Sequence, residues 1–417
     1  MKKFLAAVFC VIVVDAFFWV FTLKVFPIAN SKMIVAVVGV IAFLYKGFEE
    51  HSLPMSRRVI VSAFLAVLFS LWCYIAITLN GTYDTTYVTY YKSFATWVCG
   101  AYGTYAVLRS IHGRVDLMLL TRYIAIVCVS QCIIAVLIDN VPVVDAIVKA
   151  TFLESYDFFE RAGRLHGIGC ALDPAGVRFS AVQVLIAHQL VAEPRVRESL
   201  PKSGFMFVAF LIITIIGCII SRTTTVGTAL GLAYIAIGMF RMRRGGYVSR
   251  IQIAFSGLLL ILLAAAIALA VYLYNTSASF HSDMRFGFEG FFNWVETGEF
   301  RTTSTDILMN VMWVWPEDPR GWLIGYGQYG LYTWNTDIGY CNFVLYCGLV
   351  GLVIYSVYYL YNHLSLISKF HKFVIPALLL TAVTFIVWAK VATDIFLIDA
   401  LLFCIDGDEE ASPKKAV

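Results

Sequence analysis

The chain has 417 residues, of which 60% are hydrophobic and only 14% carry a charge. A soluble domain has about 25% charged residues and has no core large enough to bury so much apolar surface. A lipid bilayer accepts this composition because side chains that face lipid need no polar cover. The formal net charge of +4 is small, and the basic residues lie between apolar runs rather than along one stripe, which argues against nucleic acid as a partner.

The first apolar run lies at the N-terminus. Its apolar stretch is long and no small-x-small cleavage site follows it, so we expect a retained membrane span rather than a signal peptide. Further runs long enough to cross a bilayer recur along the chain, and together they predict an all-α polytopic membrane protein with about 11–12 transmembrane helices. The predicted spans are residues 4–23, 30–45, 59–79, 93–108, 118–138, 174–193, 204–220, 223–240, 251–274, 340–361 and 373–390, with a short twelfth at 392–406.

The basic residues orient the predicted bundle. With the N-terminus inside, the short inner connections carry sixteen Lys and Arg, and the longer outer connections carry ten. This excess fits a cytoplasmic N-terminus. Two outer connections are long, residues 139–173 and 275–338, and loops of that length are usually functional. We therefore expect one membrane domain over residues 1–417, with both long loops on the outer side.

The ten cysteines lie mostly inside apolar stretches. Cys128 and Cys132 are the closest pair, and no Cys-x-x-Cys occurs, so the spacing favours buried small residues over a metal or redox site. We expect no metal and no cofactor. A bridge between Cys170 and Cys341 is left open.

The first long loop begins with an amphipathic segment, residues 141–164, which predicts a helix that lies on the membrane surface or packs on the bundle. Arg161, Arg164 and His166 then precede a glycine-rich turn, and Pro174 starts the next span, a position that proline favours.

Two arginines mark the outer edge of the predicted spans. Arg178 lies about one turn inside its span, and Arg222 lies between two apolar runs with almost no loop. A charge inside a span is a functional hypothesis, and guanidinium groups bind phosphate oxygens in pairs of hydrogen bonds. The alternative is that both side chains reach to the interface as anchors.

The second long loop combines charges with aromatic rings, a composition that suits a carbohydrate groove and also suits an interfacial aromatic belt. Its candidate binding residues are Arg285, Arg301, Arg320 and Tyr326. Gly325, Gly327 and Gly330 match GxGxxG, but no βαβ context surrounds them, so we expect a tight turn rather than a dinucleotide site. Asp337 precedes a span, where it is either a general base or a helix N-cap. Lys390 is a further candidate for phosphate binding.

These features in this order resemble the O-antigen polymerases of the Wzy type, within the O-antigen ligase and polymerase superfamily. The resemblance covers roughly residues 160–360. It rests on RLHGIGCALDPAG before a span, a span that ends in SR, a long outer loop, a G-Y-G turn and DIGY before an apolar helix. Ligases of the superfamily carry a His where this chain has Asp337, which favours a polymerase.

The resemblance implies a GT-C-like fold in a bacterial inner membrane, with both long loops and the active site in the periplasm. It implies donor and acceptor glycans linked to undecaprenyl pyrophosphate, and a chain-length regulator as a further candidate partner. The same resemblance assigns the donor pyrophosphate to four arginines, Arg164, Arg178, Arg222 and Arg301. Other binding candidates are His166, Arg285, Arg320, Tyr326 and Lys390. The candidate base is Asp337. We expect a metal-independent glycosyl transfer.

Three other functions stay open. One is a ligase-like glycan transferase of the same superfamily. Another is a flippase for lipid-linked sugars, which needs charges through the bilayer and preferably symmetric halves, whereas here the charges cluster on one side. The last is a non-catalytic assembly or sensor protein whose loops serve as docking surfaces.

Overall fold

The structure, a computed structural model, describes residues 2–51, 55–154, 164–244, 250–299 and 301–408. Within these ranges it is built from helices, and the only β pairing is two isolated bridges. Six described helices are long and apolar enough to cross a membrane, so the chain is a helical membrane protein. They are α2 (Ser31–Glu50), α3 (Arg57–Asn80), α5 (Leu117–Asn140), α8 (Leu172–Ala192), α10 (Leu200–Ile220) and α18 (Gly339–Ser365).

The other predicted spans also fall on helices. These are α1 (Lys2–Phe18), α4 (Tyr90–His112), α11 (Thr224–Arg244), α12 (Arg250–Thr276), α19 (Val374–Trp388) and α20 (Phe396–Cys404). The first ends at Phe18, before the predicted end at residue 23, because the chain then pairs with a later segment: the amide of Lys24 donates to Thr151 O, and the amide of Leu153 donates to Thr22 O. The ten cysteines are free, and eight of them are buried, as expected for small core residues.

Both long connections contain helices. The first holds α6 (Pro142–Thr151), which confirms the start of the predicted helix over 141–164; residues 155–163, with Arg161, lie outside the described residues. The second is largely helical, unlike the loop predicted from its composition. It contains α13 (Ala278–Gly287), α14 (Glu289–Thr297), α15 (Thr303–Ile307), the π-helix η1 (Leu308–Met312), α16 (Pro319–Ile324) and α17 (Gly330–Thr333). The remaining short elements are α9 (Pro194–Arg197) and η2 (Leu366–Ser368).

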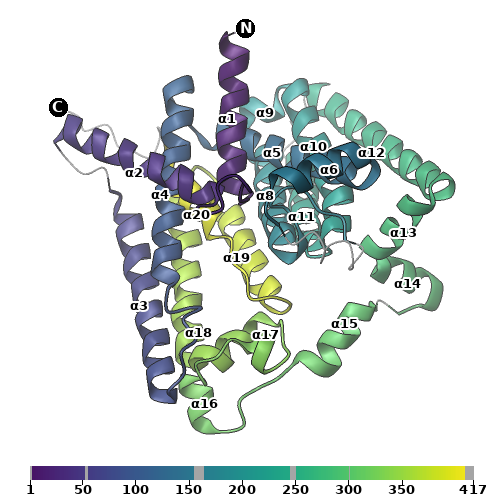
Figure 1. The fold of residues 1–417 in the computed structure, drawn as a ribbon. Helices are drawn as coiled ribbons and strands as arrows, with labels where there is room; N and C mark the ends of the chain where they lie inside the picture. The colour runs from purple at the N-terminus through teal and green to yellow at the C-terminus, as the bar shows by residue number, and fades with distance from the viewer. Residues whose placement is uncertain (1, 52–54, 155–163, 245–249, 300, 409–417) are drawn as a thin grey trace. The chain divides into compact units, whose positions relative to one another are not determined.

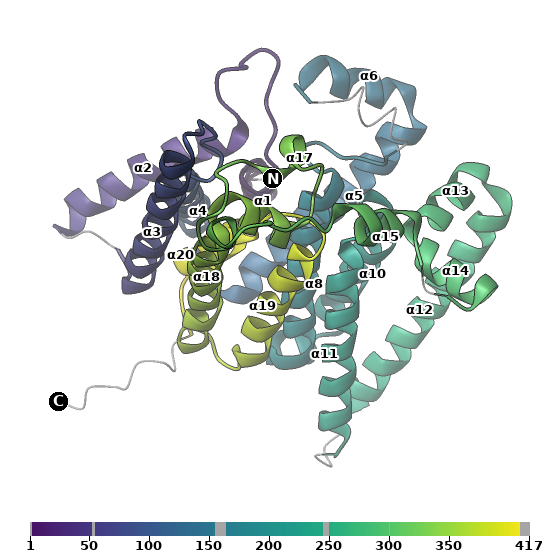
Figure 2. The ribbon, with the colours of Figure 1, turned by 90° about the horizontal axis from the view of Figure 1, so that it is seen from below.

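The chain divides into two compact units. Unit 1 comprises Met1–Asn30 and Met118–Thr302, and unit 2 comprises Ser31–Leu117 and Thr303–Val417. In unit 1, α8 packs against α10 and α11, and α12 packs against α10 and α13 (Figure 2). In unit 2, α18 packs against α3, α16 and α19, while α4 packs against α2 and α20 (Figure 1).

Unit 1 is organised by a close crossing of α8 and α11. Gly227 of α11 lies so near to α8 that a Cβ placed there would meet Ser180 Cα at 2.1 Å. Ser180 Oγ donates to Thr223 O at 3.0 Å and accepts from the amide of Gly227 at 3.1 Å. Small residues allow membrane helices to approach closely enough for such backbone contacts.

We expect Gly227→Ala to destabilise unit 1 by about 2 kcal/mol or more, because the added methyl group meets backbone atoms that cannot rotate away. Gly257→Ala is the matched control, since nothing lies within 4 Å of its Cβ position on α12. Alanine there should be neutral or stabilising by up to about 1 kcal/mol. Thermal unfolding of the two purified variants in detergent measures the difference, and equal melting temperatures would contradict the packing described here.

Unit 2 is organised by a break in α18. Gly348 has φ 65° and ψ −175°, which interrupts the helical hydrogen bonding of the carbonyl groups before it. Leu345 O accepts from the amide of Tyr326 at 2.6 Å, and Tyr346 O accepts from the amide of Gly327 at 3.0 Å. The third carbonyl group before the break, Cys347 O, accepts from Trp72 Nε1 at 2.8 Å. The glycine turn at 325–327 thus satisfies a broken helix, and no strand lies beside it in the described residues.

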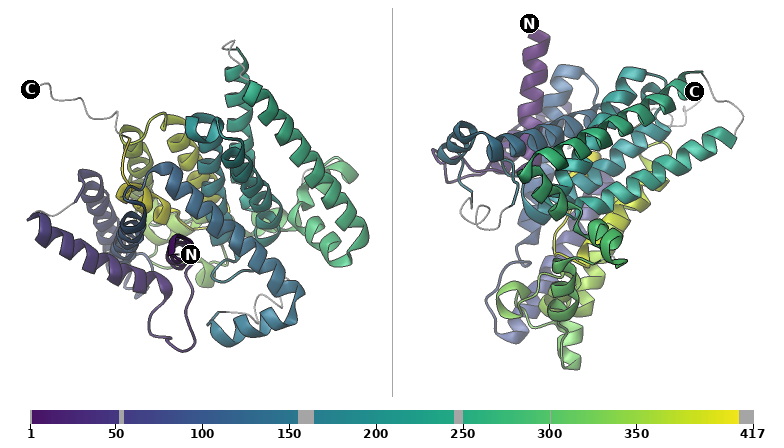
Figure 3. Two further views of the ribbon diagram at one scale, coloured as in Figure 1. Left: turned by 90° about the horizontal axis from the view of Figure 1, so that it is seen from above. Right: turned by 90° about the vertical axis from the view of Figure 1, so that its right-hand side faces the viewer.

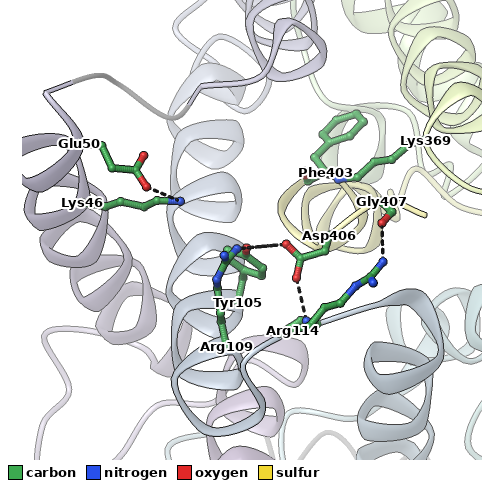
Figure 4. Close-up of polar contacts among 10 residues, drawn as sticks. Lys46, Glu50, Tyr105, Arg109, Arg114, Lys369, Phe403, Asp406 and Gly407 are labelled. Carbon is green, nitrogen blue, oxygen red and sulfur yellow. Dashed lines mark hydrogen bonds and ion pairs between the residues drawn. The ribbon is translucent and has the colours of Figure 1, made fainter. Parts of the chain in front are cut away.

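The end of unit 2 is fastened by Asp406 (Figure 4). Its Oδ1 accepts from Tyr105 Oη at 2.9 Å and lies 3.1 Å from Arg109 Nη1, and its Oδ2 accepts from the amide of Val115 at 2.8 Å. Arg114 Nη2 donates to Gly407 O at 3.0 Å. These contacts attach the segment after α20 to the end of α4.

We expect Asp406→Ala to lower the stability of unit 2 by about 1–3 kcal/mol, because the buried amide of Val115 loses its acceptor. Glu50→Ala is the comparison, since Glu50 makes only an exposed pair with Lys46 at 3.6 Å (Figure 4). Exposed pairs contribute about 0–1 kcal/mol. Chemical denaturation of both variants measures the two losses, and an equal loss would show that Asp406 is not a fastening contact.

Candidate functional site: an arginine pair beside an apolar cavity

Two of the predicted arginines share one aromatic ring in unit 1. The guanidinium carbon of Arg164 lies 4.3 Å from the ring centre of Phe286, and that of Arg222 lies 4.1 Å from the same centre. Arg222 Nε also donates to Phe286 O at 2.9 Å. Phe286 belongs to α13, which follows directly on α12 (Figure 2, Figure 3). Cation–π contact holds both guanidinium planes at one point of the fold.

Carboxylates surround this arginine pair. Arg222 Nη1 lies 2.8 Å from Glu289 Oε2, with 16% and 21% of the two side chains exposed. Burial lowers the pKa of Arg222, the nearby Glu289 raises it, and the positive charge of Arg164 lowers it again. Glu289 already compensates one of these two like charges, so a ligand anion would share the pair with this carboxylate or displace it.

Asp173 fixes the turn that carries Arg222. Its Oδ1 accepts from Ser221 Oγ at 3.0 Å and from Thr223 Oγ1 at 2.6 Å. Asp173 lies in the first turn of α8, so these two bonds join the start of that helix to the connection between α10 and α11. The sequence LDPAG and the sequence SRT therefore meet in space, although some 50 residues separate them.

An apolar cavity opens beside the pair in the same unit. Its volume is about 620 Å³, and Leu165, the residue after Arg164, lines it. Most of its wall comes from the apolar faces of α10 and α12, including Ile212, Ile216 and Leu269. Asp139 and Asp283 also line it, and burial together with the charge of Asp139 raises the pKa of Asp283. The cavity offers an apolar chain a binding space, and Leu165 connects its wall to the neighbouring Arg164 along the chain.

The loop that carries Arg164 is held by specific contacts. Gln131 Oε1 accepts from the amide of Ile168 at 2.9 Å, and Glu154 Oε1 accepts from the amide of Gly169 at 2.6 Å. Gly169 has φ +65°, and a Cβ there would meet Val20 O at 2.6 Å, so glycine is required. His166 is buried within this loop, and its Nδ1 lies 3.5 Å from Gly167 O.

Glu154 makes this loop sensitive to pH. Burial raises the pKa of its carboxyl from 4.5 to about 7, against the opposing effect of the hydrogen bond from the Gly169 amide. A raised pKa in the folded state means that the protonated form is favoured by folding. Protonated Glu154 therefore contributes fully to the free energy of unfolding below about pH 4.5, and this contribution is lost as the pH rises through about 7.

We expect the melting temperature to fall between pH 5 and pH 8, with a loss on the order of 2–3 kcal/mol from Glu154. Glu154→Gln stays neutral over this range, and its amide oxygen can still accept from Gly169. The variant should therefore lose that part of the pH dependence and be more stable than the unchanged chain at pH 8. A parallel decline of both proteins with pH would show that Glu154 is not responsible.

The structure places Arg178 apart from the arginine pair. Its Nη1 donates to Phe18 O at 2.5 Å, and its guanidinium lies 5.4 Å from the ring centre of Trp19. Arg178 thus holds the carbonyl end of α1, which is a favourable position for a cation. The expectation that Arg178 and Arg222 meet at one phosphate site finds no support in these contacts.

The other candidates of unit 1 lie in ion pairs on exposed surface. Arg285 binds Glu296 through two hydrogen bonds of 2.6 and 2.9 Å, and its guanidinium lies 5.2 Å from the ring centre of Phe292. Arg301 lies 3.2 Å from Glu299, with 59% of its side chain exposed. These contacts connect α13 and α14 and the segment that follows them.

The remaining candidates belong to unit 2. Arg320 Nη2 donates to Leu79 O at 2.6 Å, at the end of α3, and Tyr326 Oη donates to Asp318 Oδ2 at 2.8 Å. Lys390 is half-buried just after α19. Asp337 is exposed and precedes α18, whose N-cap is Ile338. The structure thus gives the N-cap position to Ile338 rather than to Asp337.

Sequence reasoning missed Phe286, Asp173 and Glu289 as members of the site. Phe286 is one of many aromatic residues within the predicted loop 275–338, and nothing in that loop signals that two distant arginines contact it. Asp173 was visible in the LDPAG segment, beside the proline that starts the helix, but its partners in the SRT turn were not.

Comparison with protein-family models, with curated proteins and with solved structures finds no match to this chain. Its function is therefore inferred from the chemistry of the site.

Proposed function

We propose that this chain is a polysaccharide polymerase that transfers a growing glycan from undecaprenyl pyrophosphate to a sugar hydroxyl of a second lipid-linked repeat unit. The observation that carries the proposal is the arginine pair, Arg164 and Arg222, next to an apolar cavity in one unit. A lipid diphosphate has two parts that complement this site: an anionic diphosphate for the arginines and a long apolar chain for the cavity.

Each part of the site has a role in this proposal. Arg164 and Arg222 bind the diphosphate oxygens, with Phe286 holding both guanidinium groups in place. The cavity takes the first part of the polyprenyl chain, and the carboxylates of Asp139 and Asp283 accept hydrogen bonds from hydroxyl groups at its rim. The proposed orientation puts this end of α10 at the outer face of a bacterial inner membrane, where lipid-linked repeats are available.

The transfer itself is a direct displacement. The bond between the anomeric carbon and the diphosphate oxygen breaks, and its electron pair leaves with undecaprenyl pyrophosphate. The acceptor hydroxyl oxygen forms the new bond to that carbon, and its proton passes to a base. The arginines stabilise the charge that develops on the leaving group, which is typically the largest catalytic effect of such donors.

We expect Arg222→Ala and Arg164→Ala each to reduce polymer formation about 100-fold, because each removes a donor to the leaving group. The polymer formation of Arg222→Lys should lie between that of the unchanged chain and that of Arg222→Ala, since lysine keeps the charge but loses the paired hydrogen bonds. Arg195→Ala is the control: Arg195 lies in the same unit and has a largely exposed side chain that pairs with Glu193 at 2.8 Å. The measurement is the ladder of products from purified protein and lipid-linked repeats.

A separate binding measurement distinguishes the parts of the proposal. Undecaprenyl pyrophosphate should bind the Asp337→Asn variant normally and the double variant Arg164→Ala with Arg222→Ala weakly, as measured by native mass spectrometry. Unchanged polymer length in both single arginine variants would remove the diphosphate role. Movement of the lipid across vesicles without any ladder would make the chain a transporter instead.

A further inference from the structure

Unit 2 contains a histidine and an aspartate that are completely buried together. His363 of α18 and Asp399 of α20 each have no exposed surface, and His363 Nε2 lies 3.3 Å from Asp399 Oδ2. In the described part of the chain neither carboxylate oxygen nor His363 Nε2 has a hydrogen bond of ordinary geometry, so this 3.3 Å approach is an ion-pair contact. A buried ionisable pair between apolar helices is costly and needs a physical account.

The opposite side of the histidine ring determines where its proton lies. Thr381 Oγ1 donates to Ala377 O at 2.8 Å, so its only hydrogen is used. His363 Nδ1 lies 3.1 Å from the same hydroxyl oxygen and must therefore be the donor to it. Nδ1 thus carries a hydrogen, and Nε2 is the nitrogen that faces Asp399.

Two protonation states satisfy this geometry. If the imidazole is neutral, Nε2 has a lone pair and Asp399 must carry the hydrogen between them. If the imidazole is charged, Nε2 carries the hydrogen and Asp399 is ionised. Both states place one proton between Nε2 and Oδ2 and leave the pair without net charge. An ionised Asp399 beside a neutral ring would instead leave a buried charge, at a cost of several kcal/mol.

We propose that His363 and Asp399 form a proton-binding site in the interior of unit 2, which holds one proton on either Nε2 or Oδ2. The site is independent of the proposed glycan transfer. Its ligand is the proton, and binding it allows α20, which carries no other charged side chain, to pack against α18 and α4.

In the described residues, neither the neighbouring tyrosines nor Lys369 binds Asp399. Tyr359 of α18 lies with its ring centre 5.9 Å from that of His363, and its hydroxyl lies 3.2 Å from that of Tyr90 on α4. Lys369 does not neutralise Asp399, because its Nζ donates to Leu402 O and Phe403 O at the end of α20 (Figure 4).

The protonation state is measured by nitrogen NMR of the full chain with labelled histidine, with His363→Gln to assign the signal. The proposal expects a proton on Nδ1 and an Nε2 signal that does not change between about pH 6 and pH 9, because the pair keeps its one proton over that range. Thr381→Val should shift the Nδ1 signal, and Thr381→Ser should not. A His363 ring whose Nδ1 lacks a proton, or a pair that loses its proton in that range, overturns the proposal.

Stability gives a second and independent test. Asp399→Asn places an amide donor opposite Nε2, so it should lower the melting temperature by at most about 3 °C. Asp399→Leu and His363→Leu each leave one polar partner buried and should lower it by more. The double leucine variant removes both partners and should recover part of the single losses. Additive losses in the double variant would show that the two residues do not act as a pair.

Discussion

A membrane interior supplies no hydrogen-bond partners, and this constraint governs how the chain folds. Every break in a helix must be satisfied by another part of the protein. The break at Gly348 frees carbonyl groups of α18, and a glycine turn and an indole N–H satisfy them. The same constraint explains why Asp173 binds two hydroxyl groups at the turn beside Arg222, where the chain reverses between two long apolar helices.

The helical fold could be predicted from the sequence because apolar runs of span length leave few alternatives. The structure of the second long connection, residues 275–338, could not be predicted from the sequence. Its charges and aromatic rings have the composition of a loop, but the structure forms α13 and α14 there, and the Arg285–Glu296 pair that joins them is a contact which local patterns do not show. The end of α1 at Phe18 was missed for a similar reason, since the pairing partner of residues 22–24 lies beyond residue 150.

The candidate site was predictable in part. Arg222 was identified as a charge at the edge of a span and Arg164 as a charge before the glycine-rich turn, and the structure brings both to one ring. Arg178 was identified like Arg222 at the edge of a span, but its guanidinium contacts Phe18 O and the Trp19 ring at the end of α1. The roles of His363 and Asp399 were also invisible, since each is a single polar residue within an apolar run, and only packing shows that they face each other.

The single ring of Phe286 under two guanidinium groups has an evolutionary consequence. Because the ring contacts both cations, a change at position 286 alters the surroundings of positions 164 and 222 together. Substitutions at these three sites should therefore be epistatic, so that the tolerance of one depends on the identity of the others. Related chains should exchange them as a set, with the triplet drifting jointly rather than site by site.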